Sequence, residues 1–491
     1  MRTKIFAPET RKWFTLAAVA FGLFMIMLDN TVVNVALPSI QRDLNTDLSE
    51  LEWIVTGYAL TFAALMLIGG KVADAYGRRL IFVVGIAVFT LASLWCGLAD
   101  TGSMLITARI VQGVGAALMN PATLSIIAAT FPPRERGTAI GIWAGVSALA
   151  LAIGPLAGGV ITEHLNWSWI FFINVPVGIL GIAASFVFID ESRDETHERL
   201  DIPGLATSGI GLFSLTYALI EANTYGWGST RIVGAFVVAA AALALFVLLE
   251  RYQRAPMLPL ELFRNRTYTG ANSVILLVAL AMFGVFFFVS LYMQNILGYS
   301  AVQAGAAFLP MTLLIVVVAP LAGRMTDRIG SRAFMTVGMA LLAIQLVYFS
   351  RLGSDATFWQ LLPAMIIGGI GMASTMTPSA AAATRSVPVD KAGVGSAVLN
   401  AFRQVGGSMG IAIMGAIMAS QAGGARPEPG VTLSPAQQAA FKSAFMDGFQ
   451  NALMVGALIA FAGAIVAFAL VRVHEREEPA ERRERGAELA A

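Results

Sequence analysis

Charge is scarce in this 491-residue sequence. Asp, Glu, Lys and Arg make up 13% of it, 57% is hydrophobic, and the mean hydropathy is +0.74. Soluble domains carry about 25% charged residues, so the composition excludes a water-soluble globular protein. It also excludes a disordered chain, which needs low hydrophobicity and high net charge. The net charge of +2 gives no bulk attraction to nucleic acid.

Cysteine and histidine are almost absent. The single cysteine, Cys96, lies inside an apolar run, so neither an internal disulfide nor a cysteine metal cluster can form. The three histidines, His164, His197 and His474, are far apart and lack metal-ligand spacing. No phosphate-binding G-x-x-x-x-G-K-S/T loop occurs, so an ATP-driven pump on one chain is unsupported. We therefore expect no metal and no cofactor.

Long apolar runs, by contrast, are abundant. A spanning helix needs about 20 mostly apolar residues, and the sequence has fourteen such runs, which predict an all-α membrane protein with 14 transmembrane helices. The first run is too long, and its flanks too charged, for a cleaved signal peptide. The runs cover residues 13–38, 51–70, 80–99, 103–128, 137–161, 169–189, 204–221, 232–249, 269–293, 303–323, 333–350, 359–380, 393–419 and 449–471.

The basic residues indicate the orientation. With the N-terminus inside, 25 of the 32 Lys and Arg fall in inner segments, 5 in outer loops, and Arg109 and Arg403 within spans. Inner loops of membrane proteins are enriched in Lys and Arg, so we predict a multi-pass protein of the cytoplasmic (inner) membrane with both termini cytoplasmic.

Before the last span, Ser434 and Pro435 have the residue types of a helix start. That segment is either a short interfacial helix or the lead-in of the last span.

Two loops repeat one pattern. Residues 70–79 read GKVADAYGRR and residues 323–332 read GRMTDRIGSR, so both contain G-x-x-x-D-x-x-G-x-R. Eight helices separate them, which predicts two parallel six-helix repeats, spans 1–6 and 9–14, with spans 7 and 8 inserted. Parallel repeats are typical of transporters, with the substrate site between the halves. The predicted domains are an N-terminal bundle (1–190), a connecting part with the inserted spans (191–266), a C-terminal bundle (267–472) and a cytoplasmic tail (473–491).

The repeated loops have chemistry suited to gating. Glycines allow sharp turns and close helix approach, an aspartate can bind a helix N-terminus, and arginines can hold carboxylates or lipid phosphates. Such a network would close when the halves approach and break when they part; the alternative is simple anchoring by positive charge. The residues concerned are Gly70, Asp74, Gly77, Arg78, Gly323, Asp327, Arg328 and Gly330.

Four further segments give the chain a family resemblance. They read LDNTVVNVALP (28–38), RIVQGVG (109–115), GPLAGG (154–159) and WSWIFFINVP (167–176). With the two loops, they make the chain resemble the major facilitator superfamily, and within it the fourteen-helix drug:proton antiporters of the multidrug efflux type. The resemblance implies two six-helix bundles around a central cavity and export by alternating access. Ala75, where the family usually has arginine, is one departure; Ala148 and Ala150, where it often has glycine, are others.

Asp29 and Arg109 are the candidates for proton coupling. An ionisable group within a span is costly and therefore a functional candidate, and a rise of about 1.5 Å per residue puts the two at similar depth in spans 1 and 4. Both spans line the cavity in the superfamily fold. We hypothesise that Asp29 binds and releases the coupled proton and that Arg109 modulates its affinity. The alternative is a static ion pair.

Other residues are candidates for bending or for substrate contact. In span 5, Gly154, Pro155, Gly158 and Gly159 form the motif associated with antiporters, which suits either a bending helix or tight static packing. Aromatic and Met-rich walls suit bulky lipophilic ligands. For Arg403 in span 13, a cavity role and snorkelling to the inner interface are equally compatible. The candidates for the substrate cavity are Asn34, Tyr58, Gln112, Phe287, Gln294 and Arg403.

The leading functional prediction is proton-coupled export of lipophilic drugs or toxic compounds by a non-enzymatic transporter. A dedicated exporter of one endogenous product, such as an antibiotic or a lipid, uses the same fold and stays open. Rings of charge for a channel and catalytic clusters for an enzyme are not visible, and the span 5 motif argues against an importer. The expected partners are small lipophilic substrates, protons and membrane lipids, with no nucleic acid, and the protein is expected to be a monomer.

Overall fold

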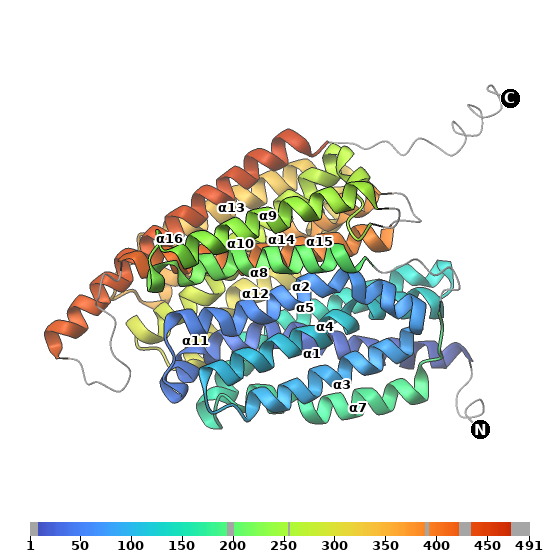
Figure 1. Cartoon of the computed structure of the whole chain (residues 1–491), viewed down its shortest axis with the longest axis horizontal. Coiled ribbons are helices and arrows are strands. Elements are labelled where there is room, and N and C mark those ends of the chain that lie inside the picture. The colour runs from blue at the N-terminus through green and yellow to red at the C-terminus, as the bar shows by residue number, and fades with distance from the viewer. Residues whose placement is uncertain (1–7, 194–200, 254–255, 388–391, 422–433, 473–491) are drawn as a thin grey trace.

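Two helical bundles lie side by side. The computed structural model describes residues 8–193, 201–253, 256–387, 392–421 and 434–472, and these contain helices and no strands. In Figure 1 a pair of green helices, between residues 202 and 252, runs lengthwise along the front of the molecule. The start of α1 and the end of α16 lie at the same end of the molecule (Figure 1), as an even number of spans requires. We call this the termini end and the opposite one the far end; the predicted tail 473–491 lies outside the described residues.

The helices fall into an N half, an inserted pair and a C half. The N half comprises α1 (Pro8–Leu44), α2 (Leu48–Tyr76), α3 (Arg78–Gly97), α4 (Gly102–Thr130), α5 (Pro133–His164), α6 (Trp169–Phe172) and α7 (Asn174–Phe188). The inserted pair is α8 (Ile202–Tyr225), which packs on α2 and α15, and α9 (Thr230–Tyr252), which packs on α8. The C half comprises η2 (Leu260–Arg264), α10 (Arg266–Leu291), a π-helical turn η3 (Tyr292–Ile296), α11 (Ala301–Ala307), α12 (Leu309–Ile329), α13 (Ser331–Phe349), α14 (Phe358–Arg385), α15 (Ala392–Gln421) and α16 (Pro435–Leu470).

The number of spans is lower than predicted when judged by length and hydropathy. Twelve helices of the described chain qualify, and α2, bent by 52° between Met66 and Ile68, makes up to thirteen. The helix over the predicted run 393–419, α15, is not among them. It is long enough at 30 residues, but Asn400, Arg403 and the serines and glycines around them lower its hydropathy. Fourteen spans are thus not confirmed, while the all-helical membrane fold is.

Polar residues cap the N-termini of α2 and α16. At α2, the Asp47 side chain accepts a hydrogen bond from the Glu50 backbone N–H, and the Glu50 carboxylate accepts one from the Asp47 backbone N–H. Ser434 and Gln437 form the same reciprocal cap at α16, which satisfies backbone donors that have no partner within the helix. Because α16 then runs unbroken from Pro435 to Leu470, the segment before the last span is its lead-in and not a separate interfacial helix.

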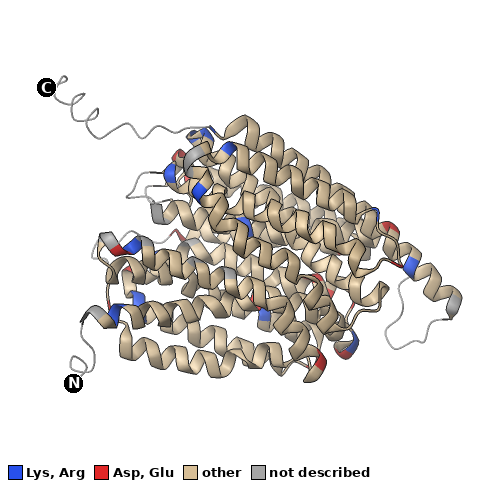
Figure 2. Cartoon of the chain, turned by 180° about the vertical axis from the view of Figure 1, so that it is seen from behind, with Lys and Arg blue, Asp and Glu red and all other residues tan. Residues whose placement is uncertain are grey.

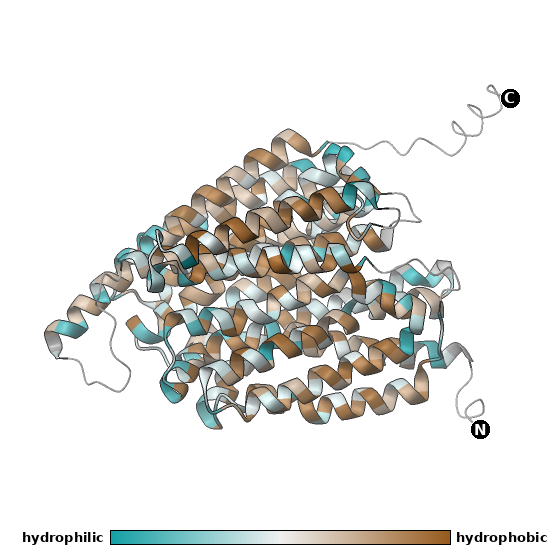
Figure 3. Cartoon of the chain, viewed as in Figure 1, coloured by the Kyte–Doolittle hydropathy of each residue, from teal (hydrophilic) through white to brown (hydrophobic). Residues whose placement is uncertain are grey.

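Hydrophobic residues occupy most of the length of the helices, and charged residues lie mainly at their ends (Figures 2 and 3). At the far end, Leu37 of α1 and Leu51 of α2 belong to one continuous core that includes helices of the C half. Toward the termini end, Leu23 and Phe82 belong to a separate core within the N half. The shared core therefore joins the two halves at the far end.

Candidate functional site

Two buried charges pair in the middle of the N half. Asp29 on α1 and Arg109 on α4 lie 2.5 Å apart, from Oδ2 to Nη1, and their side chains are 0% and 1% exposed. Burying an ion pair is costly unless its other polar atoms are also satisfied. The structure thus brings the two predicted coupling residues into direct contact.

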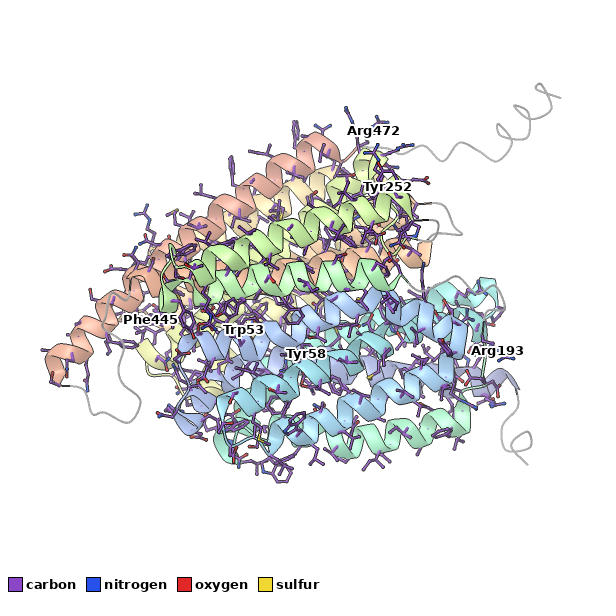
Figure 4. All side chains as sticks on the ribbon, viewed as in Figure 1. Trp53, Tyr58, Arg193, Tyr252, Phe445 and Arg472 are labelled. Atoms are coloured by element: carbon purple, nitrogen blue, oxygen red, sulfur yellow. The ribbon has the colours of Figure 1, made fainter. Side chains whose placement is uncertain are left out.

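Arg109 has further contacts besides Asp29. Its Nε donates to the carbonyl oxygen of Ile54 at 3.1 Å, and its Nη1 also donates to Oε1 of Gln112 at 2.6 Å. The guanidinium lies over the ring of Tyr58, 4.2 Å from the centroid; Figure 4 shows Tyr58 about half-way along the N half. A cation over an aromatic face is stabilised by the ring's negative charge density. Arg109 would therefore stay largely satisfied if Asp29 lost its charge.

Gln112 links this pair to two more helices. Its Nε2 donates to Oδ1 of Asp29 at 3.0 Å and to Oγ of Ser93 at 2.8 Å. Asn174 on α7 donates to the same Ser93 oxygen at 3.0 Å. Sequence reasoning missed Ser93 and Asn174; their signal was a polar residue within an otherwise apolar run. The network connects α1, α3, α4 and α7, so a change at Asp29 can reach the whole N half.

The span 5 motif packs tightly against both halves. A Cβ added to Gly158 would lie 2.6 Å from the Val32 carbonyl oxygen of α1, which leaves no room for a side chain. On the next residue, Gly159, a Cβ would collide with the backbone of Ala301 in α11. Gly305 of α11 lies as closely against the Pro155 carbonyl. Of the two interpretations of this motif, the structure therefore displays close packing, and part of that packing joins the halves.

Side chains of α10 also bind the backbone of α1. Ser290 donates to the carbonyl oxygen of Asn34 at 2.8 Å, and Gln294, in the π-helical turn, donates to that of Val35 at 2.9 Å. Asn34 itself is buried, and its side-chain amide donates to a carbonyl of its own helix. Phe287 is also fully buried, against Phe288. Of the predicted cavity residues, Asn34 and Gln294 thus lie where α1 meets the C half, and Phe287 lies in the buried core.

Glu163 adds a contact between the halves at the far end. This carboxylate, at the end of α5, accepts a hydrogen bond from the Val302 N–H at 2.8 Å. Val302 lies in the first turn of α11, where free N–H groups and the helix dipole favour an anion. With the packing of Gly159, Glu163 closes the far end of the seam between α5 and α11.

The repeated loops match in backbone shape. Gly77 and Gly330 end α2 and α12 with φ of 120° and 93°, a conformation that favours glycine. Asp74 forms an ion pair with Arg78 of its own loop at 2.7 Å. Gly70 packs near Pro121 of α4, and Gly323 near Thr377 of α14, at equivalent places in the two halves. The side chains of Asp327 and Arg328 lie outside the described residues.

A different acid occupies the helix terminus expected for Asp74. Glu191, after α7, accepts hydrogen bonds from the backbone N–H groups of Arg79 and Leu80 at 3.0 and 3.1 Å. It therefore caps α3 within the N half. In this structure Asp74 contacts its own loop, and the continuous core lies at the other end of the seam.

Comparison with known proteins identifies the family. The sequence profile of the Major Facilitator Superfamily matches residues 19–411 and 271–491. The chain belongs to the major facilitator superfamily. It is 36% identical over 419 residues to the tetracenomycin C resistance and export protein of Streptomyces glaucescens (85% of this chain, 78% of that protein). It is 39% identical over 415 residues to puromycin resistance protein pur8 of Streptomyces alboniger (84% and 82%).

Solved structures of the superfamily share the fold. The chain resembles a bacterial homologue of the human lysosomal transporter Spinster, in an inward-facing and unoccupied conformation, with a TM-score of 0.66 over 94% of this chain and 98% of that one. The sequence identity is 18%, so this likeness concerns the fold. Membership of the superfamily confirms the resemblance drawn from the sequence and identifies the chain as a membrane transporter and not an enzyme.

One buried acid of this transporter escaped sequence reasoning. Glu52, in the second turn of α2, is 2% exposed and lies against Gly415 of α15. Next to it, Trp53 donates to Glu221 of α8 at 3.3 Å, and Figure 4 shows Trp53 toward the far end. From its position near the start of a span, the Glu52 carboxylate would be expected at the membrane interface. The packing of α15 and α8 over α2 buries it.

Proposed function

We propose that the chain exports lipophilic drugs or toxic compounds from the cytoplasm in exchange for protons. The observation that supports this most is the buried Asp29–Arg109 pair, whose surroundings can satisfy Arg109 with or without a charge on Asp29. The chain's likeness to resistance and export proteins supports the direction of transport. No cofactor enters this proposal, since the proton gradient supplies the energy.

The proposed cycle alternates access between the two ends of the bundle. All fourteen predicted helices, α15 included, cross the cytoplasmic membrane, and the termini end faces the cytoplasm, as its excess of Lys and Arg indicates. The structure then corresponds to the state closed to the outside. Opening the far end requires Glu163 to release Val302 and Gln294 to release Val35.

Protonation of Asp29 is the proposed trigger. A proton from outside neutralises Asp29, which removes its attraction for Arg109 at a site with little screening by water. Arg109 keeps Gln112, the Ile54 carbonyl and the Tyr58 ring. The pair re-forms when the proton leaves to the cytoplasm, and α1 and α4, which carry the pair, contact the other helices of the N half. The coupling residues would thus alter the packing of α1, on which both α5 and α10 rest.

A dedicated exporter is the second candidate function. Several similar proteins are named for one compound, including the methylenomycin A resistance protein of Streptomyces coelicolor, 36% identical over 406 residues. Others are named as multidrug proteins, such as Stp of Mycobacterium tuberculosis, 36% identical over 409 residues. Protection of an efflux-deficient bacterium against many unrelated compounds favours multidrug export. Protection against one compound favours the dedicated exporter.

Everted membrane vesicles test the export mechanism. Respiration acidifies their interior, so the transporter should accumulate a protected compound inside the vesicles, and a protonophore should abolish that accumulation. Uptake that persists with the protonophore, or needs ATP instead, contradicts the proposal. Vesicles without the protein provide the baseline.

A further inference from the structure

Arg403 is the second arginine within a predicted span, and its surroundings differ from those of Arg109. Arg109 has a carboxylate, an amide, a carbonyl and an aromatic ring as partners. Arg403, on α15, has no hydrogen bond or ion pair with the part of the chain that the structure describes, and its Nε atom is buried. The adjacent Gln404 is 2% exposed, and its Nε2 is also buried without an acceptor. Two neighbouring side chains therefore present unused donors.

The helices around α15 offer no counter-ion at this depth. Arg403 is eleven residues from the start of α15, or roughly 16 Å along a helix axis. Of the helices that pack on α15, α10 and α14 contain no Asp or Glu, and α15 itself has none. The acids of α2 and α8 lie toward helix ends, at Glu50, Glu52, Asp74 and Glu221. Asp447 of α16 is 23 residues from the end of its helix at the termini end, or roughly 34 Å along the axis, which is much further from that end than Arg403. An unpaired cation within a membrane is costly and marks a functional position.

An aromatic surface lies beside these donors. One turn further along α15, Gly407 lies so close to the Phe283 ring of α10 that an added Cβ would be 2.7 Å from it. Phe283 and Phe286 are only partly buried, and Phe286 stacks on Phe308 with 5.3 Å between ring centroids. The Phe283 ring thus lies against α15 one helical turn from Arg403, where it could hold the body of an apolar ligand.

We propose that Arg403 and Gln404 form a subsite for the oxyanion of an amphiphilic substrate. The substrates of this subsite are apolar, aromatic compounds that carry a carboxylate or a similar oxyanion at one end. The planar guanidinium matches a carboxylate in two parallel hydrogen bonds, and the Gln404 amide adds a third donor. Binding supplies the counter-ion that the helices do not. This inference rests on the proposed export function, because it assigns a substrate class to the same transporter.

A matched pair of ligands tests the subsite directly. Pyrenebutyric acid and pyrenebutyramide share an aromatic body and differ in charge at one end. Their binding to the purified protein in lipid nanodiscs is measured by equilibrium dialysis, with empty nanodiscs subtracted. We expect the acid to bind at least tenfold more tightly than the amide. Equal affinities, or no binding of the acid, overturn the proposal.

Substitutions then assign the preference to Arg403. Arg403→Gln should weaken binding of the acid by about 10- to 100-fold and leave the amide within twofold, while Arg403→Lys, which keeps the charge and loses the planar fork, should fall between. Arg351→Gln, at an exposed position, removes the same charge and should change nothing. Equal weakening of acid and amide by Arg403→Gln would indicate a packing role and refute the subsite.

Uptake measurements in everted vesicles distinguish a wrong subsite proposal from a wrong proposal of proton-coupled export. If the acid binds through Arg403 but a proton gradient drives no uptake into everted vesicles, the subsite stands and proton-coupled export does not. If protons drive export of other compounds without a preference for the acid, export stands and the subsite does not. Thermal unfolding of each variant checks folding; should Arg403→Gln fail to fold, Arg403→Lys alone must weaken the acid selectively.

Discussion

Replacing Gly159 with alanine should open the far end of the transporter. The new Cβ would lie 2.9 Å from both the Ala301 carbonyl carbon and the Val302 Cα of α11, closer than side chains pack. Overpacking of this kind costs about 1–3 kcal/mol. The clash exists only while α5 and α11 touch, so the cost applies to the closed far end alone. The equilibrium should therefore move toward the open state by about 5- to 150-fold.

Cysteine labelling measures this shift. Thr162, on α5 near Gly159, is 8% exposed in the closed state. In a Cys96→Ser background, Thr162→Cys should react slowly with a membrane-impermeant maleimide and much faster once Gly159→Ala is added. Cys96 is the one cysteine of the sequence, so its removal leaves a chain with a single reporter thiol.

A matched control lies on the same helix. Gly145 has nothing within 4 Å of an added Cβ, and Gly145→Ala gains the same helix propensity, about 1 kcal/mol. It should leave the labelling rate unchanged. A Gly159→Ala variant that labels no faster than Gly145→Ala would refute the idea that this packing holds the far end closed.

Three further substitutions follow from the described contacts. Glu163→Gln keeps the shape but removes the charge that binds the Val302 N–H, so labelling at Thr162→Cys should rise several-fold, less than with Gly159→Ala; an unchanged rate would count against this contact. Arg109→Lys cannot keep the carboxylate, the Gln112 amide and the Ile54 carbonyl together, so proton-driven uptake should fall at least tenfold at equal expression, and full activity would contradict the role given to Arg109. Ser434→Ala removes the cap of α16 and should destabilise the protein by about 1 kcal/mol, seen as a lower thermal midpoint, whereas an unchanged midpoint would show that the cap adds nothing.

The helices and the charged pair were predictable because a membrane restricts both the backbone structure and the residue types of the segments that cross it. Backbone groups in lipid must bond within the helix, so apolar runs located nearly every helix. Asp29 and Arg109 were identifiable because charge within a span is rare, and equal depth suggested their contact. The run at 393–419 shows the limit of hydropathy, since its polar residues lower the mean hydropathy and α15 still forms.

Partners across the bundle could not be read from the sequence. Ser93 and Asn174 are separated by 81 residues, and only the packing of α3 against α7 brings them together. The burial of Glu52 was missed because it depends on the packing of α15 against α2. The Glu191 cap of α3 was missed for the same reason: an acid that lies 112 residues away from the helix start has no local signal.

The central claim is that Asp29 binds the coupled proton, and one comparison tests it most directly. Asp29→Asn keeps the size and hydrogen-bonding shape of the side chain but cannot titrate. We predict that everted vesicles with this variant still exchange labelled for unlabelled substrate, because exchange needs no proton. Accumulation driven by the proton gradient should be lost, while Asp43→Asn, at an exposed position on the same helix, should retain both. Undiminished proton-driven accumulation by Asp29→Asn would contradict the account.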